Sequence, residues 1–87
     1  MFIIQFKTVK CKYMKEKIYK FCKNFSKNLK IERKQKNLTQ KQVADALGIK
    51  TQSYQAYETC IAMPTVENLL KISIFFDISI DELFEIK

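Results

Sequence analysis

The 87-residue sequence has no histidine and no tryptophan, and it contains one glycine and one proline. Turn-rich β sandwiches and barrels use far more glycine and proline, so their scarcity favours helices. Without histidine, and without a closely spaced cysteine pair, the chain lacks the ligands of a tetrahedral zinc site and a base to activate a nucleophile. No run approaches the ~18 apolar residues of a membrane span. We therefore expect no metal, no cofactor, no membrane association and no enzymatic activity.

The cysteines are few and widely spaced, at Cys11, Cys22 and Cys60. An odd number without a C-x-x-C pair is best interpreted as three free thiols in a reducing compartment. A secretory signal is not expected either, because the apolar run at residues 2–9 is short and basic residues follow it. Together these features predict a cytoplasmic protein.

Positive charge is concentrated at one end of the chain, whose net charge is +7. The first 27 residues contain eight lysines against the single acidic residue Glu16, whereas residues 28–87 are neutral overall. Acidic residues of that second part gather between Asp77 and Glu85. This division predicts a basic N-terminal extension, residues 1–27, followed by one small domain, residues 28–87.

The extension has two different patterns. Residues 2–9 alternate in a way that suggests a short β-strand, and lysine-rich residues 10–15 read as a connector. From Met14 onward, an apolar stripe at helical spacing predicts an amphipathic helix that continues to about Lys36. The stripe comprises Met14, Ile18, Phe21, Cys22, Phe25 and Leu29. Three interpretations stay open: the stripe packs on the domain, its lysines contact DNA phosphates, or the helix lies on an anionic membrane.

Two short helices joined by one glycine follow. Thr39 with Gln42 forms a capping box that starts the first, and Gly48 supplies the left-handed residue that ends it. The second runs to about Glu58, with Tyr54 and Tyr57 facing inward. Two helices joined by a short turn with glycine form a helix-turn-helix unit, whose second helix can enter the DNA major groove.

Start signals predict two further helices. Thr65 opens one that ends near Phe76, and the Ser79–Glu82 capping box opens the last, with Leu83 and Phe84 buried. In the first of these we expect the inward residues to be Val66, Leu69, Leu70, Ile72 and Phe75. Other apolar residues exceed what so small a core holds, which predicts a protein contact surface. They are Ile61, Met63, Ile74, Phe76, Ile80 and Ile86.

From Leu29 to Lys87, the sequence resembles the phage-repressor/Cro-type (XRE) helix-turn-helix family. The resemblance spans about two thirds of the chain, with the family's motifs in the correct order and spacing. They are Leu29-Lys30 with Arg33, Leu38-Thr39-Gln40, Val43-Ala44, Leu47-Gly48, Tyr57-Glu58, Pro64-Thr65, Leu69-Leu70-Lys71-Ile72 and Ser79-Ile80-Asp81-Glu82-Leu83. The resemblance implies an all-α, five-helix fold of the lambda-repressor type and a sequence-specific DNA-binding transcriptional regulator that binds as a homodimer.

The resemblance also implies roles for individual residues. Arg33 and Glu58 match a buried ion pair that joins the first helix to the end of the recognition helix. Glutamine suits adenine, and threonine or alanine suits a thymine methyl group. The base-reading positions are Thr51, Gln52, Gln55 and Ala56. The positions expected to contact phosphate are Gln40, Lys41, Lys50 and Thr59.

The sequence departs from the family pattern after the recognition helix. The family usually has Asn-Gly and then basic residues there, whereas this chain has Thr59-Cys60-Ile61-Ala62. The lysine-rich extension could restore the lost electrostatic attraction to DNA. Ile61 and Met63, or the extension itself, could instead bind another protein, as in an interaction module or an antitoxin. A Ser or Thr cap is also missing at Lys50, so the helix cap shifts to Thr51 or is lost.

Overall fold

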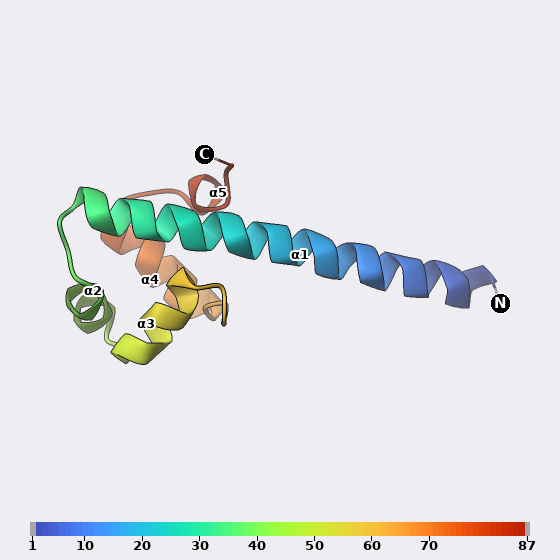
Figure 1. Ribbon diagram of the computed structural model, residues 1–87, viewed down its shortest axis with the longest axis horizontal. Coiled ribbons are helices and arrows are strands. Elements are labelled where there is room, and N and C mark those ends of the chain that lie inside the picture. Colours follow the sequence, from blue (N-terminus) through green and yellow to red (C-terminus); the bar gives the residue numbers. More distant parts are fainter. Residues whose placement is uncertain (1, 87) are drawn as a thin grey trace.

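The computed structural model describes the backbone of residues 2–86 and the side chains of residues 13–86. Over this range the chain is all-α, with five helices and no strand (Figure 1). No helix among the described residues combines the length and apolar character needed to cross a bilayer. The helices are α1 (Phe2–Gln35), α2 (Gln40–Leu47), α3 (Thr51–Glu58), α4 (Val66–Phe76) and α5 (Ile80–Leu83).

Helix α1 is 34 residues long, and its N-terminal part projects beyond the other helices (Figure 1). The predictions of a strand at residues 2–9 and a connector at residues 10–15 are therefore wrong, because both segments are helical. An unpaired strand would leave its backbone N–H and C=O groups without partners, whereas a helix pairs them internally. A short apolar run fits both the two-residue period of a strand and the 3.6-residue period of a helix, so the sequence pattern could not distinguish them.

The C-terminal half of α1 packs on the domain. Phe25 and Leu29 are buried in the core beside residues from all four other helices. Asn28 is buried too, and its side-chain amide donates to the carbonyls of Leu83 at 2.8 Å and Glu85 at 2.7 Å, at the end of α5. The expectation that the stripe packs on the domain is confirmed for Cys22, Phe25 and Leu29. It is wrong for Met14 and Ile18, which remain exposed, whereas Phe21 is 48% exposed but meets the ring of Phe84 edge-on, with the centroids 6.1 Å apart.

The predicted boundaries of the four shorter helices are confirmed, and local capping chemistry sets most of them, whereas α1 begins at Phe2 rather than at the predicted Met14. Thr39 with Gln42 and Ser79 with Glu82 both form complete capping boxes. Gly48 ends α2 in the left-handed region, at φ 71°. The α3 cap is lost: Lys50 occupies the N-cap position without a side-chain hydrogen bond.

The buried face of α4 differs from the predicted one. Ile72 is buried and Leu69 packs on the core, as expected, but Val66 is 75% exposed and Leu70 and Phe75 are exposed too. Phe76, which we expected at the surface, is buried. The apolar residues of α4 are distributed around its whole circumference, so their spacing does not identify the face that meets the core.

Candidate nucleic-acid interface

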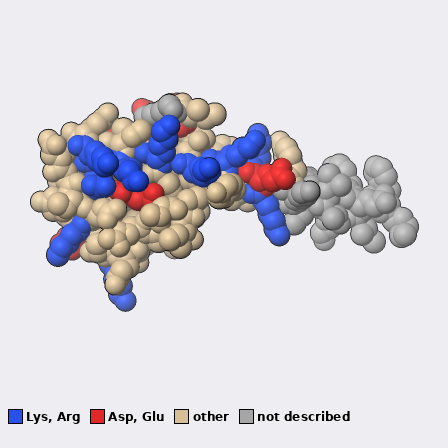
Figure 2. Space-filling view, viewed as in Figure 1, with Lys and Arg blue, Asp and Glu red and all other residues tan. Residues whose placement is uncertain are grey.

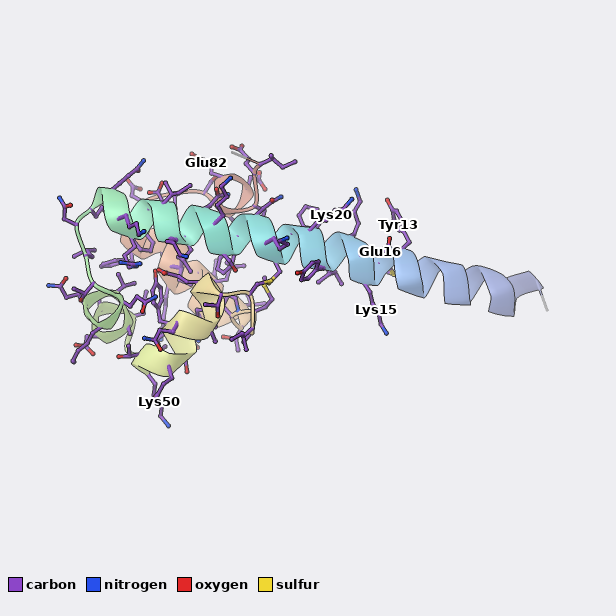
Figure 3. All side chains as sticks on the ribbon, in the orientation of Figure 1. Tyr13, Lys15, Glu16, Lys20, Lys50 and Glu82 are labelled. Carbon is purple, nitrogen blue, oxygen red and sulfur yellow. A yellow bond between two sulfur atoms is a disulfide. The ribbon has the colours of Figure 1, made fainter. Side chains whose placement is uncertain are left out.

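The helix-turn-helix unit is anchored from inside by aromatic residues. Tyr54 and Tyr57 of α3 are buried, and Ile49 in the turn packs against the same core. This fixes α3 with its opposite face outward, where Gln52, Gln55 and Thr59 are exposed. Thr51 and Ala56 are half-buried at the sides of that face. Lys50, the N-cap residue that precedes α3, points away from the domain (Figure 3).

A buried ion pair joins α1 to the end of α3. The guanidinium of Arg33 donates from Nε to Glu58 Oε2 at 2.7 Å and from Nη2 to Oε1 at 3.1 Å. Its Nη1 donates to the carbonyl of Leu38 at 2.9 Å. The Glu58 side chain is fully buried and that of Arg33 is 13% exposed. The bidentate geometry holds both helices in a fixed relation.

The charge state of Glu58 follows from this geometry. Burial by itself would raise the pKa of the carboxyl group, but hydrogen bonds, led by those from Arg33, outweigh it. The net result is a pKa below the usual glutamate value, and the pKa of Arg33 is raised by the same contact. Both groups are therefore charged at neutral pH.

Gln40 extends this network to the surface of α3. Its side-chain amide donates to Glu58 Oε1 at 3.0 Å, and its carbonyl oxygen accepts from Gln55 Nε2, also at 3.0 Å. A continuous chain of side chains thus runs from α1 through Glu58 and Gln40 to an exposed glutamine of the recognition helix. Gln55 is therefore linked to the buried ion pair through Gln40.

The four residues expected to contact phosphate lie around α2 and α3, but most of their polar groups have partners. Gln40 belongs to the network just described, and Lys41 pairs with Asp45 at 2.9 Å. Both the backbone N–H and the hydroxyl of Thr59 donate to the Gln55 carbonyl within the helix. Lys50 points away from the domain (Figure 3).

A disulfide joins Cys22 of α1 to Cys60, just beyond α3, with the two Cα atoms 5.8 Å apart (Figure 3). The expectation of free thiols is therefore wrong for these two residues, and the Cys11 side chain lies outside the described residues. The pairing arises because α1 runs past the end of α3, which brings together residues separated by 38 positions. No local sequence signal indicates such a contact. Cys60 also adopts the left-handed conformation, at φ 63°, where the family usually has glycine.

The apolar residues after α3 lie at the surface. Ile61 is 80% exposed and Met63 41% exposed. Among the described side chains, no three cysteine or acidic residues gather closely enough to hold a metal ion.

The fold and the exposed face of α3 define a helix-turn-helix protein. Residues 29–83, more than half of the chain, match the helix-turn-helix family, and the chain belongs to that family, in its phage-repressor (XRE) type. The resemblance identified in the sequence is thereby confirmed.

Two curated relatives are similar to this chain. It is 52% identical, over 60% of its length, to the cryptic phage CTXphi transcriptional repressor RstR of Vibrio cholerae. It is 48% identical, over 70% of its length, to the HTH-type transcriptional regulator YqaE of Bacillus subtilis. The chain spans about half the length of these relatives, 46% and 53% respectively. No solved structure matches it significantly.

Proposed function

We propose that this protein is a sequence-specific DNA-binding transcriptional regulator of the repressor type, acting in the cytoplasm. The observation that carries the proposal is the exposed face of α3, where Gln52 and Gln55 stand outward while Tyr54 and Tyr57 anchor the helix. An exposed glutamine can bond bidentately to adenine in the major groove. Membership in the helix-turn-helix family and the names of the two relatives support the same conclusion. The five helices are consistent with a lambda-repressor-type arrangement.

In this proposal the residues divide by role. Thr51, Gln52, Gln55 and Ala56 face the bases, with Gln55 hydrogen-bonded to Gln40. Arg33 and Glu58 position the recognition helix without touching DNA. Because base contacts specify and phosphate contacts position, changes to Gln52 should alter sequence preference and leave general affinity intact.

The test is selection of DNA sequences from a random duplex library by the full chain, followed by comparison with Gln52→Ala. We expect one enriched sequence for the parent protein. The variant should lose about 1–3 kcal/mol of discrimination at one base-pair position, with unchanged affinity for random DNA. No enrichment by the parent protein would refute the proposed function. An equal loss on every sequence would refute the role of Gln52.

The proposal includes a homodimer, and the exposed part of α1 supports it. Met14, Ile18 and Phe21 continue the face of α1 that packs on the domain, yet here they lie at the surface. A second copy of α1, antiparallel and crossing near Ile18, would cover this stripe. Helix rise then places the two copies of Ser26 about 24 Å apart and those of Arg33 about 45 Å apart. Both residues contact α3. The distance between the two recognition helices of such a dimer would therefore lie between these two values, which include the 34–36 Å that separates half-sites one DNA turn apart.

Neighbouring residues of nearly equal exposure provide the test. Ile18 is 59% exposed and belongs to the stripe, whereas Tyr19 is 58% exposed and points to another side of α1. In sedimentation, Ile18→Asn should shift the protein toward monomer, and Tyr19→Asn should not. A parent protein that is already monomeric at high concentration, or an equal effect of both variants, would refute this interface.

A further inference from the structure

A hollow of about 400 Å³ lies between α1 and the end of α3. One side is formed by lysines at spacings of four, three and four residues, so they share one face of α1. These are Lys23, Lys27, Lys30 and Lys34, and we call the hollow with its lysines the lysine groove. Figure 2 shows basic side chains gathered along α1 on the face in view. The other side is formed by Thr59 and Cys60, where α3 ends.

The residues that line the lysine groove are mostly basic, with four lysines and one acidic residue. Glu58 is the acidic residue in its lining, but it is fully buried and is neutralised by Arg33. The described ion pairs of other lysines, Lys36 with Glu32, Lys41 with Asp45 and Lys71 with Glu67, lie outside it. The groove therefore presents concentrated positive charge beside a recognition helix.

The position of the groove relative to α3 determines what it can bind. The outward face of α3 carries Gln52, Gln55 and Thr59 at positions i, i+3 and i+7, so it leads along the helix directly to the groove wall. When this face of α3 lies in the major groove of DNA, a sugar-phosphate backbone passes the C-terminal end of the helix. From Lys23 to Lys34, α1 rises about 16 Å, comparable to the rise of four to five nucleotides in one strand.

The lysine groove lies where the region after α3 lacks groups that could contact the DNA backbone. This chain has no basic residues directly after α3, and both donors of Thr59 are used within the helix. We propose that the lysine groove of α1 binds the DNA backbone beside the recognition helix and replaces the basic loop found in the family. The inference rests on the proposed function and adds its main electrostatic anchor.

The test measures how DNA affinity depends on salt. In the full chain, Lys30→Gln and Lys34→Gln are combined, and binding to a selected operator and to random duplex DNA is titrated across salt concentrations. Each lost phosphate contact lowers the slope of log K against log salt by ~0.9, so the expected decrease is about 1.8. The ratio of operator to random affinity should stay unchanged, because phosphate contacts carry no sequence information.

Two control proteins make the result specific. Lys36→Gln with Lys71→Gln removes the same charge from sites outside the groove, and it should leave the slope nearly unchanged. Lys30→Arg with Lys34→Arg keeps the charge and should keep the slope, and thermal unfolding verifies that each variant is folded. An unchanged slope for the groove variant, or an equal decrease in the first control, would overturn the inference while leaving DNA binding intact. A parent protein that binds no DNA at low salt would overturn both.

Discussion

Truncation of Arg33 should destabilise the fold far more than an ordinary surface change. Three side-chain hydrogen bonds hold the Glu58 carboxylate, two from Arg33 and one from Gln40 at 3.0 Å. Arg33→Ala removes two of the three and leaves a fully buried carboxylate without its counter-charge. Loss of one partner of a buried pair costs about 3–5 kcal/mol. Because Gln40 remains, we expect the lower end, about 3 kcal/mol, or a Tm decrease on the order of 12–24 °C.

A double-mutant cycle in urea, followed by circular dichroism, measures this effect. Glu58→Ala should cost a similar amount, and with a coupling energy of about 2 kcal/mol the double variant should cost only about 1 kcal/mol more than either alone. Lys41→Ala is the matched control, because it breaks an exposed pair with Asp45 that is worth about 0.3–0.5 kcal/mol. Additive effects of Arg33→Ala and Glu58→Ala, or losses as small as the control, would refute the reasoning.

Two further perturbations address the same region. The pKa of Glu58 is lowered in the folded protein, so its stabilisation is present above the usual value of 4.5 and is lost as pH falls through the folded pKa. The advantage of the parent protein over Glu58→Gln in unfolding free energy should therefore shrink with acidification; a constant difference would contradict this. For the oxidised chain, Cys60→Ser should cost about 4 kcal/mol, given the 38-residue separation, and dithiothreitol should abolish that difference. Under reducing conditions Cys60→Gly should be about 1 kcal/mol more stable than Cys60→Ser, because the backbone there is left-handed; equal stabilities would refute this account.

Local chemistry made part of the fold predictable. Gly48 and the capping box at Thr39 act within a few residues, so their signals can be read directly from the sequence. Family motifs were equally informative about Arg33 and Glu58, which do form an ion pair. They gave no indication that Gln40 links this pair to Gln55.

What the sequence failed to predict depends on contacts between distant segments. The meeting of Cys22 with Cys60 is decided by the path of α1 past α3. The inward side of α4 is decided by its neighbours, since Val66 and Phe76 are similar in character and have opposite exposures. The lysine groove has the same origin: the lysines of α1 are evident in the sequence, but their position beside Thr59 is not.

The uninterrupted course of α1 has a consequence for how this protein could change over generations. A flexible linker would let its two ends vary independently, but in one continuous helix every inserted residue advances the chain by 1.5 Å and turns it by about 100°. A single insertion between Ile18 and Arg33 would therefore swing the exposed stripe to another side of the molecule. Insertions of three or four residues nearly restore the direction in which the stripe points, and they change the length of α1 by about one helical pitch, 5.4 Å. Variation in the reach of this helix should accordingly occur in whole turns.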